Sequence, residues 1–342
     1  MKKTDEFGAA LKRVAAGHAL NEAEATAAFT ALMSGVVSPA RVASFLTALA
    51  MRHASVDELI GGARVMRGAV LGVDAPPGAV DVCGTGGDGQ GTLNVSTAAA
   101  FVVAGSGVPV AKHGNRAMSS RTGSADVLEA LGGHISLEPG GAEACLRAAR
   151  ICFMFAQVYH PSMKHVASIR QELGFRTVFN LLGPLSNPAH VKRQLIGVYD
   201  ESWLEPFAHA LKALGAEKAW IVHGQGMDEL ALSGVTKVAA LEKGDVRTFE
   251  ITPEDVGLTR APIKAIKGGN AQKNAEAIRE LVRGASGPFR DIVLLNAGAA
   301  LVVADKVHDL RDGIRLAAAA IDEGAAEAAL DTFIAASQEV AA

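Results

Sequence analysis

The sequence predicts an α/β fold: a mainly parallel central sheet with flanking helices, plus a smaller all-helical domain at the N-terminus. Consecutive helical patterns fill the first seventy residues, and a Pro/Gly-rich break follows at 72–79. Beyond the break, short apolar runs alternate with helical patterns, which is typical of parallel strands joined by crossover helices. We expect a helical domain over residues 1–72, completed by a segment near 163–185, and an α/β domain over 73–342.

The N-terminal helices carry their own start signals. Ser38 is expected to cap a helix with Pro39 at its first position. The apolar face of that helix consists of Val42, Phe45, Leu46 and Leu49. The next helix opens with a capping box from Ser55 to Glu58. Its apolar face is expected to consist of Leu59, Ala63, Met66 and Val70.

The apolar runs beyond the break are the expected strands. They are AVDVC (79–83), VPVAKHG (108–114), HISL (134–137), ICFMFA (151–156), QLIGVY (194–199) and AWIVHG (219–224). Helices are expected from about Ser96 and over SADVLEALG at 124–132. The segment 236–251, with a Lys-Gly-Asp turn, predicts a peripheral hairpin, and closing helices are expected from NAGAALVVA at 296–304 onward.

Composition limits the function classes. The chain has 342 residues, 49% of them hydrophobic, and a formal net charge of −3. It has no Lys/Arg-rich tract, so nothing indicates a nucleic-acid or anionic-membrane partner. Because the N-terminus mixes acids with bases and no long uninterrupted apolar run follows, we expect a soluble cytoplasmic protein. Three cysteines without CxxC spacing, Cys83, Cys145 and Cys152, predict core residues rather than disulfides or a zinc site.

A glycine-rich loop follows the first expected strand. Gly84 to Gly89 spell G-x-G-x-x-G, the string of a dinucleotide-binding fingerprint. That fingerprint opens its helix at the third glycine and places an acidic residue at the end of the second strand. Here five residues intervene before a helix can start, and the second strand ends in Lys112, His113 and Arg116. The sequence departs from the fingerprint at both points.

The same segment is better suited to phosphate. Glycines let backbone N–H groups approach an anion, and a helix N-terminus attracts negative charge. Asn94, Ser96 and Thr97 lie at that helix start, and Lys112 adds a full charge. A Walker loop is excluded because G-K-[ST] is missing. We expect a site for a ligand that carries phosphates at two ends.

Four segments carry a resemblance to a known family. They are 84–102, 112–132, 160–189 and VHGQGMDEL at 222–230, and together they resemble the anthranilate phosphoribosyltransferases of tryptophan biosynthesis. The likeness runs from about Met33 to Phe333. It implies a homodimer that uses phosphoribosyl pyrophosphate (PRPP) with two Mg²⁺ ions per active site. The implied reaction converts PRPP and anthranilate to N-(5-phosphoribosyl)anthranilate and pyrophosphate.

The resemblance also implies the site residues. PRPP-binding positions are Gly84, Thr85, Gly86, Gly87, Asp88, Thr92, Asn94, Val95, Ser96, Thr97, Lys112, His113, Gly114, Asn115, Arg116, Ala117, Met118, Ser119, Ser120 and Ser124. Anthranilate-binding positions are Gly84, Asn115, His160, Arg170 and Gly183. The magnesium ligands are Ser96, Asp228 and Glu229. Some relatives carry an aromatic residue where this chain has Met163, so the outer acceptor pocket is where we expect a difference.

The chemistry and the competing functions follow from these residues. Transfer at an anomeric carbon needs stabilisation of departing pyrophosphate and a positioned nucleophile. An arylamine can attack while neutral, so no general base is assigned. The guanidinium of Arg170 matches a carboxylate acceptor. Alternatives are a pyrimidine nucleoside phosphorylase, which binds free phosphate and a nucleoside, and a non-catalytic nucleic-acid-binding relative of the same fold.

Overall fold

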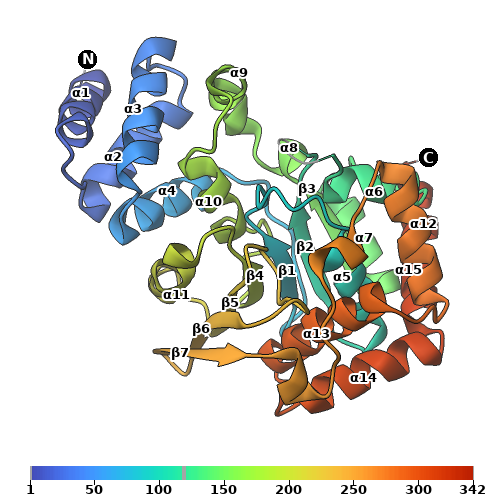
Figure 1. Cartoon of the computed structure of the whole chain (residues 1–342). Helices are drawn as coiled ribbons and strands as arrows, with labels where there is room; N and C mark the ends of the chain where they lie inside the picture. Colours follow the sequence, from blue (N-terminus) through green and yellow to red (C-terminus); the bar gives the residue numbers. More distant parts are fainter. Residues whose placement is uncertain (1, 118–120, 342) are drawn as a thin grey trace.

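The computed structural model describes residues 2–117 and 121–341 (Figure 1). Four helices come first: α1 (Lys2–Ala15), α2 (Glu22–Met33), α3 (Pro39–Arg52) and α4 (Val56–Gly68). Pro39 begins α3, and the capping box of Ser55 and Glu58 begins α4, as predicted. The Ser38 side chain makes no capping hydrogen bond. Val70 lies beyond the end of α4 and packs against the α/β core, so its placement on the face of that helix was wrong.

One seven-stranded sheet organises the rest of the chain. Its order is β3-β2-β1-β4-β5-β6-β7. The first five strands are parallel, and β6 pairs antiparallel with both β5 and β7. The strands are β1 (Val80–Gly84), β2 (Val110–Gly114), β3 (Ile151–Phe155), β4 (Arg193–Gly197), β5 (Lys218–Gly224), β6 (Thr236–Glu242) and β7 (Asp245–Ile251). The predicted hairpin is β6 and β7, which extend the parallel sheet at one edge. The strand order reverses between β1 and β4, where ligands of open α/β sheets bind.

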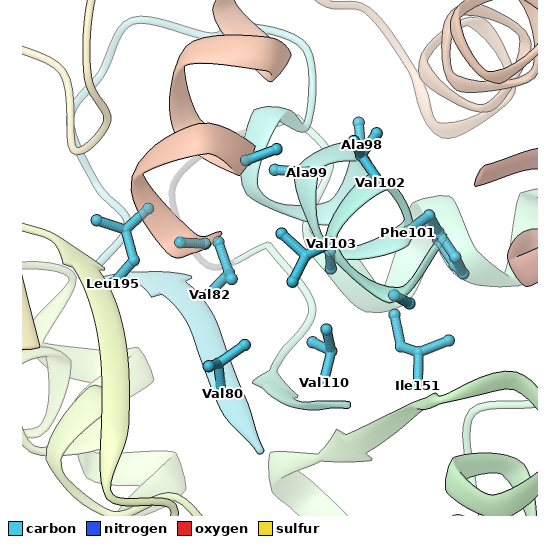
Figure 2. Packing of buried hydrophobic residues seen from close by; sticks show 14 of the residues in the cluster. Val80, Val82, Ala98, Ala99, Phe101, Val102, Val103, Val110, Ile151 and Leu195 are labelled. Carbon is cyan, nitrogen blue, oxygen red and sulfur yellow. The ribbon is translucent and has the colours of Figure 1, made fainter. Parts of the chain in front are cut away.

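Helices cover both faces of the sheet, as predicted for parallel strands. On one face, Val80 and Val82 of β1 pack with α5 (Val95–Gly105) and the C-terminal helices. Figure 2 shows Val80, Val110 and Ile151 pointing from the strands toward α5, which carries Phe101 and Val103. The remaining helices of this layer are α6 (Ser124–Ala130), α7 (Pro139–Ala149), α12 (Ala271–Val282), α13 (Pro288–Val303), α14 (Leu310–Asp322) and α15 (Ala325–Ala341). The closing helices therefore begin at α12, before the expected residue 296.

The N-terminal helices belong to the apolar cluster on the other face. Cys83, Ile196 and Ile221 point to this face and share a core with α1–α4 and α11 (Leu204–Ala213). Two later helices, α9 (Lys164–Leu173) and α10 (Val178–Leu185), pack against α2, α3 and α4 (Figure 1). A one-turn helix, α8 (Ala156–Tyr159), precedes them, and short 3₁₀ turns lie at Pro161–Met163, Glu201–Trp203, Pro253–Val256 and Ile263–Ile266. The domain division at residue 72 stays a prediction.

The expected strand at 134–137 is wrong. Within the part of the chain that the structure describes, the segment forms no strand and pairs with none of the seven strands. Its apolar side chains, Ile135 and Leu137, are nevertheless buried. Side chains satisfy its backbone: the His134 N–H donates to Ser337 Oγ at 2.9 Å, and the Leu137 carbonyl accepts from the Tyr159 hydroxyl at 2.9 Å. Burial alone explains the apolar pattern that predicted a strand.

The other composition-based predictions can be compared directly with the structure. Cys83, Cys145 and Cys152 are buried free thiols, which confirms that they are core residues. Among the described residues, no helix has the length and hydropathy needed to cross a membrane.

Candidate active site

The glycine loop leaves the carboxyl end of β1 at the point where the strand order reverses. Gly86, Gly87, Gly89 and Gly91 have φ angles from 58° to 77°, a backbone conformation that favours glycine. Helix α5 starts only at Val95, with Asn94 as its N-cap. The loop is therefore longer and more open than the tight turn of a dinucleotide fingerprint, as the sequence predicted.

An acidic pair after β5 faces this loop. An oxygen of the Asp228 carboxylate accepts a hydrogen bond from the Gly86 N–H at 2.7 Å, and Glu229 Oε1 accepts from the Ser96 N–H at 3.1 Å. Two glycines make room for Asp228. A Cβ at Gly84 would lie 2.3 Å from Asp228 Oδ2, and a Cβ at Gly197 would lie 1.5 Å from the Asp228 carbonyl oxygen. Carboxylates thus occupy N–H donors of the loop and of the α5 N-terminus.

Burial and repulsion from a neighbouring carboxylate raise the pKa of both acids. Burial raises the pKa of Asp228 to about 7, and the nearby charge of Asp88 adds to that increase. Burial also raises the pKa of Glu229 well above its usual range, with the Asp228 charge as the second cause. The site therefore holds more negative charge than the surrounding protein stabilises, which is an environment that a bound cation would relieve.

The donor atoms fit magnesium. Ser96, Asp228 and Glu229 offer only oxygen, the ligand type that Mg²⁺ prefers. Within residues 2–117 and 121–341, no group of three or more His, Cys, Asp or Glu side chains could hold a metal by itself. Mg²⁺ usually keeps waters and binds substrate phosphates in addition to one or two carboxylates. The acid pair matches that mode of binding.

Lys112 lies beneath the site rather than on the surface. Its side chain is 3% exposed, and Nζ donates to the Val82 carbonyl at 2.5 Å and to Ser96 Oγ at 3.4 Å. The cation predicted for the anion site is therefore within hydrogen-bond distance of the expected metal ligand Ser96. A lysine inside a buried strand is stable only with such partners.

A buried carboxylate that the sequence analysis did not single out supports the same strands. Asp81 in β1 accepts from the His113 N–H at 3.2 Å and from Asn187 Nδ2 at 2.8 Å. Asn187 Nδ2 also donates to the Ala111 carbonyl at 2.9 Å. The charge of Lys112 favours ionised Asp81, although burial acts more strongly and raises its pKa. An acid within the apolar run AVDVC was the available signal.

Two predicted site histidines form a pair. The Nε2 atoms of His113 and His160 lie 3.2 Å apart, and both side chains are buried. Burial lowers the pKa of His113 to about 3 and that of His160 to about 4. A hydrogen bond with the Gly183 backbone opposes the shift at His113, and so it links β2 to α10. Both rings are neutral near pH 7, and in this contact one ring donates to the other.

Three of the remaining predicted PRPP-binding residues, Arg116, Ser124 and Gly114, make close contacts within the protein. Arg116 pairs with Asp126 at 2.9 Å and Glu129 at 2.5 Å, and its guanidinium lies over the Phe155 ring. Ser124 Oγ donates to the Asn115 carbonyl at 3.2 Å. A Cβ at Gly114 would meet Ser124 Oγ at 2.3 Å, so glycine is required there.

Two other predicted PRPP positions are buried, one donates its backbone N–H to Asp126, and three lie outside the described residues. Val95 and Thr97 point into the core, and Thr97 Oγ1 is a buried oxygen with no hydrogen-bond partner among the described residues. Ala117 donates its N–H to Asp126 at 3.1 Å. Met118, Ser119 and Ser120 lie outside the described residues.

Two of the predicted acceptor residues, Arg170 and Gly183, lie on the two helices that follow His160. Arg170 of α9 lies over the ring of Phe179 in α10, with the guanidinium carbon 5.4 Å from the ring centroid. Burial lowers its pKa to about 10, so it stays charged. Gly183 borders open space, because no atom lies within 4 Å of a Cβ built there. Met163 is partly buried in the core of the N-terminal helices.

A C-terminal segment that the sequence analysis did not single out closes the other side of the loop. Thr92 pairs with Lys267 as an isolated β-bridge, and Lys267 Nζ donates to the Gln90 carbonyl. Buried Asn274 donates to Asn94 Oδ1 at 2.8 Å and accepts from the Gly269 N–H at 2.7 Å. The glycine pair in IKGGN at 266–270 was the only local signal.

Two family models match the chain. Residues 9–69 match the helical bundle domain of a glycosyl transferase family, and residues 76–327 match the α/β domain of a glycosyl transferase family. The chain is 54% identical over 338 residues to anthranilate phosphoribosyltransferase of Azorhizobium caulinodans, and the match spans 98% of each chain. The chain belongs to the anthranilate phosphoribosyltransferase family. The resemblance predicted from the four segments is thereby confirmed.

Solved structures of anthranilate phosphoribosyltransferases share the fold. The Thermus thermophilus enzyme is 45% identical, with a TM-score of 0.91 over 96% of this chain and 99% of that chain. The Saccharomyces cerevisiae enzyme in complex with PRPP and Mg is 28% identical, with a TM-score of 0.88 over 97% of this chain and 98% of that chain. The same yeast enzyme has also been solved with 4-fluoroanthranilate. The predicted fold class, a helical domain with a mostly parallel α/β domain, is confirmed.

Proposed function

We propose that this chain transfers the phosphoribosyl group of PRPP to the amine of anthranilate, as a step of tryptophan biosynthesis. The products are N-(5-phosphoribosyl)anthranilate and pyrophosphate. One observation carries the proposal: an acidic pair, Asp228 and Glu229, lies against the N–H donors of a glycine loop and a helix N-terminus at the reversal of strand order. Family membership and the yeast complex with PRPP and Mg support the same reaction.

In the proposed donor site, the loop Gly84–Gly91 and the first residues of α5 bind the phosphates of PRPP. The N–H groups of Gly86 and Ser96 donate to Asp228 and Glu229, and the other N–H groups of the loop and of the α5 N-terminus stabilise negative charge on the departing pyrophosphate. Lys112 and the backbone of residues 112–117 complete the site. Ser124 is part of the proposed donor site, as are Met118, Ser119 and Ser120, which lie outside the described residues.

Ser96, Asp228 and Glu229 would hold two Mg²⁺ ions. Bound magnesium neutralises charge on the pyrophosphate as it leaves. The protein residues keep these ligands in place: Gly84 and Gly197 leave room for Asp228, and Lys112 donates to Ser96 Oγ. The raised pKa values of both acids support a site that is completed by a cation.

In the proposed acceptor site, anthranilate lies among Gly84, Asn115, His160, Arg170 and Gly183. The open space beside Gly183 supports the location. Arg170, held over Phe179, pairs with the anthranilate carboxylate and orients the amine. His113 and His160 are neutral and keep the pocket free of competing charge. The arylamine attacks while neutral, and its proton becomes acidic as the new bond forms.

The proposal includes the assembly and cellular setting. We propose a homodimer, with a helical domain over 1–72 completed by 163–185, acting in the cytoplasm on small molecules and on neither nucleic acid nor membrane. The resemblance is the support for the dimer. The shared apolar core of α1–α4 with α9 and α10 supports the composite helical domain.

The test uses the purified chain with anthranilate, PRPP and Mg²⁺. Loss of anthranilate fluorescence that requires all three components is the expected result. A parallel reaction contains uridine and phosphate in place of both substrates. Turnover in that reaction alone would replace the proposed function with nucleoside phosphorolysis, and no turnover in either would refute it.

A further inference from the structure

We propose that Arg176 is a positioning residue that ties the glycine loop to the segment carrying the acceptor site, so that the two substrates bind in a coupled way. The inference rests on the proposed function. Arg176 is exposed, yet its guanidinium makes two contacts. Nη1 donates to the Gly87 carbonyl at 2.8 Å, and Cζ lies 4.1 Å from the centroid of the Tyr199 ring. Together they hold a side chain that would otherwise sample many rotamers.

The two contacts belong to a closed ring. The Tyr199 N–H donates to Thr85 Oγ1 at 3.1 Å, and Thr85 leads through Gly86 to Gly87. Tyr199 is itself held, since its hydroxyl accepts from Trp203 Nε1 at 3.2 Å. The aromatic platform under the guanidinium is thus anchored to the same loop that the guanidinium binds. Moving the loop therefore requires moving Arg176 or breaking one of its contacts.

The hydrogen bond from Arg176 to the Gly87 carbonyl fixes the orientation of one peptide unit of the loop. Gly87 has a φ of 77°, and the neighbouring Gly86 N–H donates to Asp228. In a trans peptide unit the C=O and the following N–H point in opposite directions. Holding the Gly87 carbonyl toward Arg176 therefore turns the Asp88 N–H away from it. Arg176 fixes the orientation of a loop amide without touching the proposed substrate position.

The chain direction links this contact to the acceptor side. Arg176 lies between Gly174, whose φ of 65° ends α9, and Thr177, which caps α10. Helix α9 carries Arg170 and α10 carries Gly183, two residues of the proposed acceptor site. A shift of the loop on binding PRPP is therefore transmitted directly to the connector of these helices. Coupling between sites through such a shared contact is reciprocal.

The experiment compares Arg176→Ala, Arg176→Lys and Arg311→Ala by calorimetry of PRPP with Mg²⁺, with and without benzoate, which has the carboxylate of anthranilate but lacks the reacting amine. Arg311 is a matched control, because it is an exposed arginine that also donates to a backbone carbonyl, that of Asp255. We expect Arg176→Ala to weaken PRPP binding roughly tenfold and to reduce the effect of benzoate on the affinity for PRPP. Arg176→Lys should recover only part of both, and Arg311→Ala should match the parent.

A double-variant cycle tests the ring itself. Because Tyr199 acts through Arg176, Arg176→Ala combined with Tyr199→Leu should lose no more PRPP affinity than Arg176→Ala alone. Additive losses would overturn the positioning role, as would parent-like PRPP affinity in folded Arg176→Ala or a parent whose PRPP affinity is unchanged by benzoate. A parent that binds PRPP but does not consume anthranilate would refute the proposed function while leaving the PRPP measurements on Arg176 interpretable.

Discussion

Gly84 ends β1 directly against the Asp228 carboxylate, and Gly84→Ala tests how closely that carboxylate must be placed. Gly84 has no positive φ, so alanine fits the backbone and the effect is purely steric. The new methyl would start 2.3 Å from Asp228 Oδ2 and 2.9 Å from its Cγ. Reaching an ordinary contact of about 3.5 Å requires the carboxylate to move by roughly 1 Å.

That shift also breaks the 2.7 Å hydrogen bond from the Gly86 N–H to the carboxylate. A misplacement of about 1 Å in a catalytic site costs on the order of a hundredfold in rate. Overpacking costs about 1–3 kcal/mol of folding stability, which a chain with so large a core tolerates. We therefore expect kcat/KM for PRPP to fall about a hundredfold and the Mg²⁺ concentration for half-maximal rate to rise.

The assay is an initial-rate series in PRPP and in Mg²⁺ at saturating anthranilate, with a thermal melt of each variant. Gly140→Ala is the matched control, since it has an ordinary φ and no atom within 4 Å of the added methyl. It should keep parental rates. Gly84→Ala with parental rates and parental Mg²⁺ dependence would show that the position of Asp228 does not limit the reaction, and the assignment of the acid pair would fall.

Three further predictions concern the acids, the acceptor and pH. Glu229→Gln removes a carboxylate charge at nearly constant shape, so Mg²⁺-dependent turnover should fall far more than the melting temperature; an unchanged Mg²⁺ titration contradicts this. Arg170→Ala should lower kcat/KM for anthranilate by about tenfold to a hundredfold through loss of a charge-assisted contact, with partial rescue by lysine; a loss confined to the PRPP terms would move Arg170 to the donor side. Burial lowers the pKa of His113 to about 3 and of His160 to about 4, so the folded state excludes protons that the unfolded chain binds below about pH 6.5. Their contribution to stability is therefore full above that pH and is lost as the pH falls, by up to about 1.4 kcal/mol per pH unit for each ring. In denaturant unfolding at pH 7.5 and pH 5, His113→Gln should lose less stability on acidification than the parent, and equal losses would refute neutral burial.

Local signals in the sequence predicted most of the framework. Pro39 and the capping box at Ser55 begin helices because they satisfy or remove N-terminal N–H donors within one turn. The residues of β1 to β5 are buried almost without interruption because both faces of a parallel sheet are covered. The glycine loop was distinguishable from a dinucleotide fingerprint because the number of residues between Gly89 and the start of the helix can be counted in the sequence.

Local patterns also explain the one wrong strand. Ile135 and Leu137 are buried as the apolar run suggests, but burial does not require a strand partner. Only the assembled sheet shows that β3 is its edge and that Ser337 and Tyr159 satisfy the backbone instead. Hydropathy reports exposure to water, and it contains no information about which group accepts a hydrogen bond.

The contacts that make the site a unit were decided by tertiary structure. Gly86 meets Asp228 across 142 residues, Asn94 meets Asn274 across 180, and Arg176 meets Gly87 across 89. None of these pairs has a periodicity or spacing that a linear pattern could reveal. The family resemblance marked Asp228 and Glu229 as metal ligands, but not that their carboxylates bind the loop and helix N–H groups. Residue types along the chain therefore determined which chemistry is available. The meeting of strand ends at one edge of the sheet determined which groups act together. The reason is that a hydrogen bond depends on position in space and not on distance along the chain.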